Sequence, residues 1–275
     1  MQVIAIGAPD GVHPAVHRVG RTLDEVLTAV AGLLADDVVV ATRDDEARDV
    51  ARSARLVLGP ERVGLLHVDA PVTAWAVALA GISTEGLTAS AAQAVATEVL
   101  ARTATRVLLS SVAGLDRPAP TFRQHAGSYL PRTAFVVDPV RGTVGRFGGR
   151  LGLPDGGDLL VVARSARPVV PADGGDLLSR GPDTTLNGAL PGWPAARWFE
   201  ASTVVGALSS AVAAAVSASY RWGACDVCGR AVAGACIFCG VTDRRARLPR
   251  ADPLRPGQPG PALLDSQPDN LGVIS

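Results

Sequence analysis

The chain has 275 residues, of which 48% are hydrophobic, and its 26 basic residues balance 26 acidic ones, so the formal net charge is zero. This composition predicts a folded protein with a sizeable core and disfavours one that coats nucleic acid or an anionic membrane. All the basic residues are arginines, and the absence of lysine excludes Walker-type phosphate loops, Schiff-base pyridoxal phosphate enzymes and kinase-type ATP pairing.

Residues 1–115 carry alternating strand and helix signals. Gln2–Ile6 is a short apolar run typical of a strand, and Thr22 with Glu25 forms a capping box that starts a helix. Apolar residues continue at helical spacing as far as Leu34. The other elements expected here are strands at 38–41, 63–68 and 106–112, and helices from Asp44-Asp45 through Arg52, from Pro71 to a C-cap at Gly81, and over 89–102.

Strands that lack internal alternation and are separated by helices are typical of a parallel sheet covered on both faces. We therefore predict a layered, Rossmann-like α/β domain with mostly parallel strands over residues 1–115. The first loop, Gly7-Ala-Pro-Asp-Gly11, does not match GxGxxG, so the dinucleotide-binding fingerprint is missing.

The sequence changes character at residue 116, and residues 116–194 predict a β-rich extension that ends in a loop. The segments 133–137 and 143–147 flank a turn and predict an antiparallel hairpin. Another strand is expected at 159–163. Residues 179–194 are rich in Gly, Pro, Asn and Asp and predict a loop or lid.

Residues 195–222 predict a long helix of small residues, because the stretch between Glu200 and Arg221 is uncharged and mostly Ala, Ser, Thr and Val. Aromatic residues stand at both ends, as they do in membrane spans. Small residues serve equally well for close helix packing. We expect a helix that is buried or faces an oligomer partner, and we disfavour a membrane span.

The four cysteines of the chain lie within residues 225–240, as Cys225-x-x-Cys228 and Cys236-x-x-Cys239, each pair followed by glycine. Two such pairs can present four thiolates tetrahedrally to one Zn²⁺. This sixteen-residue segment resembles the knuckles of zinc-ribbon and rubredoxin-like proteins. The resemblance implies a structural Zn²⁺ within a module at 223–243. Iron is the chemical rival and a pair of disulfides the metal-free alternative.

Residues 244–275 form a tail rich in Arg and Pro, for which the composition predicts flexibility. The arginines that follow the cysteines make contact with nucleic acid through the knuckle one alternative. A solvated tail is the interpretation we favour.

Polar side chains follow the predicted parallel strands and define a candidate crevice, since open α/β sheets bind ligands where their strands end. Asp10 and His13 follow the first strand, and His67 and Asp69 close the third. These four residues are candidates for acid, base or metal-ligand roles. The structural alternative is that such carboxylates, Asp69 and Asp44 among them, only cap helices.

The chain begins in a strand without a basic segment or cleavage site, which disfavours a signal peptide and predicts a cytoplasmic protein. We predict a non-catalytic, zinc-stabilised binding or assembly protein acting in an oligomer or larger complex. One alternative is an enzyme that uses the strand-end crevice on a small molecule, with or without a metal. The other is a nucleic-acid-binding protein that uses the knuckle and its arginines.

Overall fold

The structure is a computed structural model of the chain, and it describes residues 1–130, 133–167, 169, 177–188, 192–219, 223–232 and 235–240. These residues belong to one compact unit, Met1–Asp243. The predicted tail at 244–275 lies outside the described residues.

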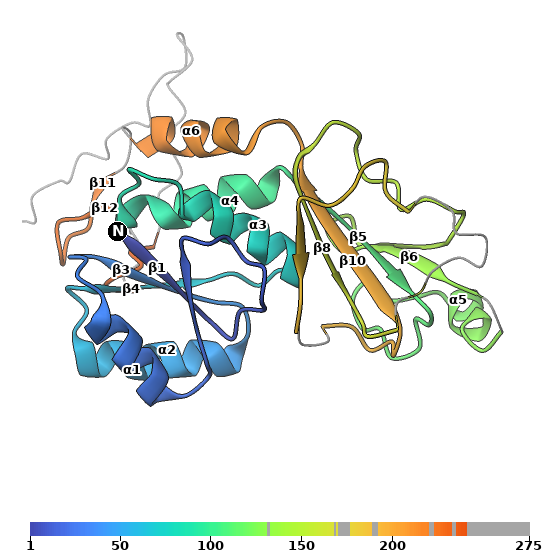
Figure 1. Ribbon diagram of the computed structural model, residues 1–275, viewed down its shortest axis with the longest axis horizontal. Helices are drawn as coiled ribbons and strands as arrows, with labels where there is room; N and C mark the ends of the chain where they lie inside the picture. The colour runs from blue at the N-terminus through green and yellow to red at the C-terminus, as the bar shows by residue number, and fades with distance from the viewer. Residues whose placement is uncertain are drawn as a thin grey trace, which may run out of the picture. The chain divides into compact units, whose positions relative to one another are not determined.

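A four-stranded parallel sheet with the order β2-β1-β3-β4 forms the first half of this unit (Figure 1). Its strands are β1 (Gln2–Ile6), β2 (Val16–Val19), β3 (Val38–Thr42) and β4 (Val63–His67). Every residue of β3 is buried, because helices cover the sheet on both faces. The predicted α/β fold with a Rossmann-like parallel sheet is confirmed.

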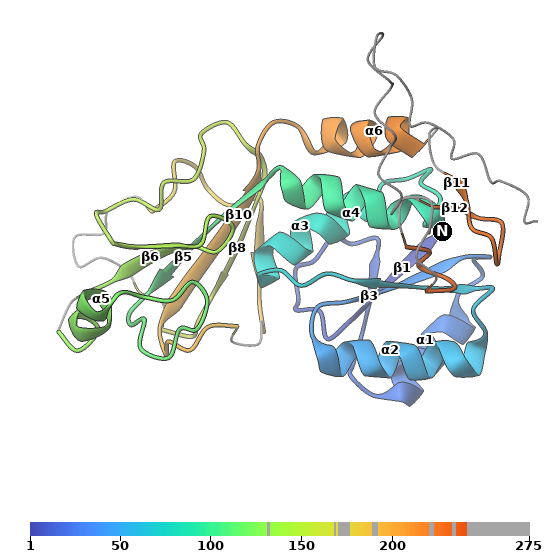
Figure 2. The ribbon, with the colours of Figure 1, turned by 180° about the vertical axis from the view of Figure 1, so that it is seen from behind.

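Helical layers cover the two faces of the parallel sheet (Figures 1 and 2). Alternate residues of its central strands pack against opposite layers. Ile4 and Val40 pack with α1 (Leu23–Gly32) and α2 (Asp45–Leu58) on one face. Val3 and Val39 pack with α3 (Val72–Ile82) on the other. Beyond α3 lies α4 (Ala92–Ala101), which follows the short 3₁₀ helix η1 (Ala89–Ala91).

The helix starts at Thr22 and Asp44 are confirmed, but some helix ends differ, since α2 continues past the predicted Arg52 to Leu58. The Thr22 hydroxyl accepts from the Glu25 N–H at 3.4 Å while the Glu25 carboxylate accepts from the Thr22 N–H at 3.1 Å. Gly81, however, is no C-cap, since α3 continues through Ile82. A Cβ at Gly81 would lie 2.8 Å from a Val99 methyl carbon, so glycine is there to let α3 and α4 approach closely.

A second, six-stranded sheet follows, with the order β7-β6-β5-β10-β8-β9. Its strands are β5 (Thr103–Leu109), β6 (Phe135–Asp138), β7 (Thr143–Arg146), β8 (Asp158–Arg164), β9 (Thr184–Leu186) and β10 (Trp198–Val204). Only the β8–β9 pair is parallel among these described pairings. The predicted hairpin corresponds to β6 and β7, and α5 (Phe122–Gly127) lies between β5 and β6. The strand predicted at 106–112 is β5 and belongs to this sheet, not to the parallel one.

The long helix predicted at 195–222 is wrong in its first half. Trp198–Val204 forms β10, in the middle of the second sheet, and all seven of its residues are buried. A strand buried on both faces shows no polar alternation, which is why its sequence resembled a buried helix. The helix α6 (Leu208–Ser219) begins only afterwards and packs against α4. No helix in the described part of the chain combines the length and the apolar character needed to cross a membrane.

Candidate functional site

The structure brings the four predicted cysteines together. Their sulfur atoms all lie within 4.8 Å of one another, and those of Cys228 and Cys236 are 3.6 Å apart. A tetrahedral Zn²⁺ site with Zn–S bonds of about 2.3 Å needs sulfurs separated by roughly 3.8 Å, so the cluster fits such an ion. The first pair lies in the loop between β11 (Gly223–Ala224) and β12 (Ala231–Val232), which form a small antiparallel ladder, and the second pair follows β12.

Both cysteine turns have the same backbone geometry. Gly229 and Gly240 adopt φ of +70° and +71°, a left-handed conformation that glycine adopts without strain. The N–H of each glycine donates to the carbonyl of the first cysteine in its pair, Cys225 or Cys236, at 2.8 Å. Each turn therefore leaves its remaining N–H groups free to point toward sulfur.

The environment acts differently on the individual thiols. Backbone N–H donors from Cys228 and Val227 stabilise the Cys225 thiolate and lower its pKa to about 7. Burial, a hydrogen bond with Cys228 and the neighbouring sulfur charges raise the pKa of Cys239 to about 12. A bound cation would offset the mutual repulsion of four thiolates in such a cluster.

The second cysteine turn packs against the parallel sheet of its own chain. The Leu65 N–H of β4 donates to the carbonyl of Ile237 at 2.8 Å, and the Arg55 guanidinium donates to that of Phe238 at 3.0 Å. Phe238 is only 1% exposed, and the Arg230 guanidinium lies 3.8 Å above its ring. This turn therefore covers the edge strand β4, whose N–H groups would otherwise be open to another chain.

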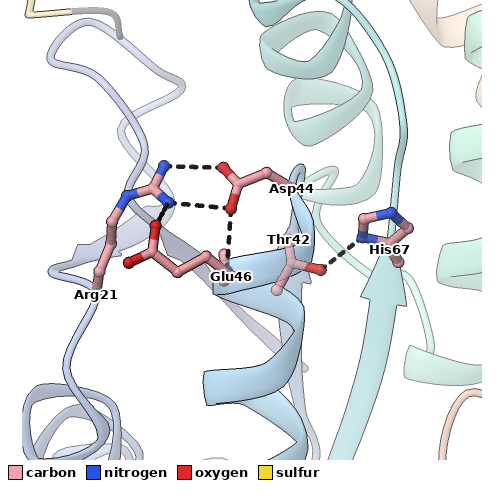
Figure 3. Close-up of polar contacts among 6 residues, drawn as sticks. Arg21, Thr42, Asp44, Glu46 and His67 are labelled. Atoms are coloured by element: carbon pink, nitrogen blue, oxygen red, sulfur yellow. Dashed lines mark hydrogen bonds and ion pairs between the residues drawn. The ribbon is translucent and has the colours of Figure 1, made fainter.

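A polar cluster marks the carboxyl edge, the edge at which the strands of the parallel sheet end (Figure 3). The Thr42 hydroxyl lies 3.1 Å from Nδ1 of His67, at the ends of β3 and β4. Beside this pair, the Arg21 guanidinium donates to both carboxylate oxygens of Asp44, at 3.0 and 2.8 Å, and to Glu46 at 3.0 Å. The hydrogen bond from Arg21 holds the pKa of Asp44 below its ordinary value.

Helix N-termini near this edge are each occupied by a carboxylate of the chain itself. Glu25 belongs to the capping box of α1, and Asp44 accepts from the Ala47 N–H at the start of α2, at 3.0 Å. Glu200 accepts from both the N–H and the hydroxyl of Thr73 in the first turn of α3, each at 2.7 Å. These are the positions at which open α/β proteins hold phosphate, so the arrangement disfavours an anionic nucleotide here.

The Glu200 carboxylate is the centre of a buried network that sequence reasoning missed. Its second oxygen accepts from the Trp193 indole N–H at 2.6 Å. The Thr73 hydroxyl continues to Ser202 at 2.6 Å, and Ser202 continues to Thr105 at 2.7 Å. No local pattern signals this network, because its members lie on α3, β5, β10 and the preceding loop.

The predicted crevice residues do not share one place. Asp10 pairs with Arg18, and its backbone bridges that of Asn187. His67 ends β4 at the carboxyl edge, next to the exposed Asp69. His13 instead precedes β2 and lies at the opposite, amino edge. The eleven residues of α3, which rise about 16 Å, carry the chain from one edge to the other.

Two adjoining cavities lie at this amino edge. One of about 770 Å³ is lined by residues 1–3, by His17 and by residues 82–87. The other, of about 610 Å³, is lined by His13, by the end of α3 and by parts of the second sheet. Both share Ala15 and residues 83–85. We call this continuous depression the amino-edge groove. His17 is a residue of β2.

Two buried polar atoms, Oε1 of Gln2 and Oγ of Ser83, have no hydrogen-bond partner among the described residues. Gln2 pairs with Val38, which packs with α1 and α2, so the Gln2 side chain lies on the face of the sheet away from α3. Ser83 is the C-cap of α3 and lines both cavities, although its Oγ is itself buried. Neither residue belongs to a motif, so the sequence held no signal for them.

No family model matches the sequence, and no curated protein matches it. Among solved structures, the chain is similar to a DegV family protein from Eubacterium eligens loaded with heptadecanoic acid. That protein is 12% identical with a TM-score of 0.48, over 74% of this chain and 99% of that one. A DegV family protein from Corynebacterium glutamicum is 12% identical with a TM-score of 0.45, over 75% and 97%. The Streptococcus pneumoniae fatty acid kinase B3 protein, loaded with linoleic acid, is 11% identical with a TM-score of 0.39, over 60% and 82%.

These comparisons correct the predicted function. The similar structures are named for the DegV family or for bound fatty acids, not for zinc-stabilised assembly, catalysis in a strand-end crevice or nucleic-acid binding. The two segments that were predicted to contact partners, the long helix and the cysteine knuckle, instead make contacts within the chain. Residues 198–204 form a buried central strand, and the turn around Phe238 packs on β4.

Proposed function

We propose that the protein binds a small molecule in the amino-edge groove. The observation that carries this proposal is the continuous groove itself, whose larger cavity of about 770 Å³ is lined by polar residues such as Ser83 and Glu85 beside apolar ones. Ligand sites typically measure about 300–1,000 Å³ and combine apolar walls with a few polar groups that fix orientation. Ile82 and Leu87 supply apolar wall here.

The polar groups at the carboxyl edge differ from the groove, because they already have partners within the chain. There Arg21 is paired with Asp44 and Glu46, Thr42 lies against His67, and Glu200 occupies the start of α3. Polar groups that already satisfy one another gain little from a ligand, because binding must first break the internal bonds. Glu85 lines the groove, is exposed and makes no hydrogen bond or ion pair with another described residue, so it carries no such cost.

A blocking variant tests the proposal. Ala15 is exposed and lines both cavities, so Ala15→Phe is expected to fill the groove. Ala31, exposed on α1 across the sheet, provides the matched control Ala31→Phe. The protein is screened by thermal shift against amines, alcohols, sugars and long-chain fatty acids. A ligand should raise the melting temperature of the unmodified protein and of the control, but not of Ala15→Phe. A ligand that stabilises all three equally contradicts the groove as its site.

We further propose that Cys225, Cys228, Cys236 and Cys239 hold one Zn²⁺ with a structural role. Support comes from the four mutually close sulfurs and from the complete donor set, which leaves no position for a substrate. Native mass spectrometry should show one Zn²⁺ per chain, lost in Cys236→Ser. A visible thiolate–iron absorption would identify iron instead, and a mass lower by four hydrogens without metal would identify two disulfides.

A further inference from the structure

We infer that the second half of the fold holds a separate site for an organic phosphate, a phosphate monoester joined to an apolar group. The site is a cavity of about 380 Å³, lined by the start of β5, the turn after β6, Pro154 and Val205. Three arginines line it, namely Arg102, Arg106 and Arg141, and it shares no lining residue with the amino-edge groove. It therefore stands apart from the small-molecule function proposed for that groove.

Two of the guanidiniums approach the same carboxylate oxygen. Asp138 ends β6 opposite Arg106 of β5, and its Oδ2 lies 2.8 Å from Nη1 of Arg106 and 3.8 Å from Nε of Arg141. The other oxygen, Oδ1, accepts from the N–H groups of Val140 and Arg141 at 3.1 and 2.9 Å. These bonds hold the turn that carries Arg141 against the strand that carries Arg106. One carboxylate thus faces two positive charges beside the cavity and leaves one of them uncompensated.

Arg106 keeps unused donors, although its side chain is only 14% exposed. Its Nη1 donates to the Thr105 carbonyl at 2.8 Å and pairs with Asp138. Its Nε and Nη2 contact no acceptor among the described residues, and they are not sealed from solvent. Since Arg106 lines the cavity, an anion bound there can accept from these N–H groups. A guanidinium already held by internal bonds loses little side-chain freedom when it binds such an anion.

Arg102 brings a third guanidinium to the cavity. Its Nε and Nη2 contact Glu98 at 2.8 and 2.6 Å, and its Nη1 has no acceptor among the described residues. Glu98 does not line the cavity, where three guanidiniums meet the one carboxylate of Asp138. A phosphate monoester presents three terminal oxygens and about −1.5 to −2 charges at pH 7. A carboxylate ligand has two oxygens and a single charge, so we expect it to bind more weakly.

Exposed apolar side chains border the cationic groups. Val140 and Val205 are 69% and 51% exposed, and Pro154 is exposed as well. Ligand sites typically combine such apolar wall with a few polar groups that fix the orientation of the ligand. A ring or short chain attached to the phosphate can pack on these residues. The cavity is therefore better suited to an organic phosphate than to inorganic phosphate.

The test uses four probes that separate the head group from the ring: phenyl phosphate, benzoate, benzyl alcohol and inorganic phosphate. Amide chemical shifts of the ¹⁵N-labelled full chain measure binding and locate it. We expect phenyl phosphate to shift the amides of residues 101–106 and 138–141 and to bind more tightly than the other three. Arg141→Gln, at a largely exposed side chain, should weaken phenyl phosphate by about two- to fivefold at low ionic strength. The control Arg146→Gln removes an exposed arginine of β7 that does not line the cavity, and it should match the unmodified protein.

Val205→Glu provides a second variant, because it places a carboxylate at the border of the cavity from an exposed position. Like-charge repulsion should weaken phenyl phosphate at least as much as Arg141→Gln does. Equal affinities of Arg141→Gln and Arg146→Gln would reduce the effect to general attraction by positive charge and overturn the site. Benzoate that binds there as tightly as phenyl phosphate overturns the phosphate class. If phenyl phosphate leaves the amides of residues 101–106 and 138–141 in place, the site itself fails. None of these results bears on the amino-edge groove, whose test is Ala15→Phe.

Discussion

The carboxylate of Glu200 caps the first turn of α3, the turn that contains Thr73. The two residues are 127 positions apart in the chain. One oxygen of Glu200 accepts from both the N–H and the hydroxyl of Thr73, each at 2.7 Å, and both residues are fully buried. The first turn of α3 leaves N–H groups without intrahelical partners, and a carboxylate is well suited to satisfy them. This contact attaches the central strand of the second sheet to the helix that covers the parallel sheet.

Replacing this carboxylate should destabilise the protein strongly. Glu200→Gln presents an amide N–H₂ to one of the donors on Thr73 or Trp193 and leaves that donor unsatisfied in the core. We expect a loss of about 2–3 kcal/mol in the free energy of unfolding, measured with urea. Glu85→Gln, at an exposed site, should change it by less than about 0.5 kcal/mol. Equal stability of the two variants would show that the buried contact contributes nothing.

The pair of Arg21 and Asp44 should make stability depend on pH in the acidic range. The hydrogen bond from Arg21 lowers the pKa of Asp44 from its ordinary value of 3.8. The folded state therefore binds a proton less readily than the unfolded state, and the stabilisation is present above the ordinary value and lost as pH falls through the lowered one. Asp44→Asn retains an N-cap side chain but not the charge, so it should cost about 0.2–1 kcal/mol at pH 7.

The same variant provides the control for that pH dependence. The difference in unfolding free energy between Asp44→Asn and the unmodified protein should begin to shrink as pH falls below about 4 and should vanish below the lowered pKa of Asp44, where the carboxyl group is protonated in both states. Urea titrations at several pH values measure it. A difference that stays constant from pH 7 to the acidic limit would assign the effect of the substitution to packing and not to the ion pair.

The contact between Leu65 and Ile237 makes a specific prediction about metal removal. The Leu65 N–H donates to the Ile237 carbonyl at 2.8 Å, within the turn that carries Cys236 and Cys239. If the four cysteines hold Zn²⁺ as proposed, its removal with a chelator should release this turn and expose the edge of β4. Hydrogen exchange should then accelerate at Leu65 while the Val40 amide, in the middle of the sheet, stays protected. Unchanged protection at Leu65 would mean that the turn holds its place without metal.

Two glycines in helices should respond in opposite ways to alanine. A Cβ at Gly81 would lie 2.8 Å from a Val99 methyl carbon, whereas nothing lies within 4 Å of one at Gly32. Gly32→Ala should stabilise by up to about 1 kcal/mol through helix propensity. Gly81→Ala gains the same propensity but crowds α3 against α4, so it should destabilise by about 1–3 kcal/mol. Thermal unfolding compares the two, and a stabilising Gly81→Ala would contradict the close packing of these helices.

Much of the parallel half was predictable because its determinants are local. The Thr22–Glu25 capping box, the Asp44 cap and the unbroken apolar strands each depend on neighbours within a few residues. The cysteine cluster was predictable for the same reason, since sixteen residues hold both pairs. Short-range hydrogen bonds and periodicity are properties of the sequence itself.

Tertiary structure alone decided the remaining features. Trp198–Val204 became a central strand because partners on both sides supply its hydrogen bonds and bury both of its faces. His13 and His67 separated because the chain returns to the amino edge before β2 begins. The Glu200 network and the unpaired Gln2 and Ser83 consist of single residues from distant elements. No local pattern encodes such meetings, since each depends on how sheets and helices pack after they form.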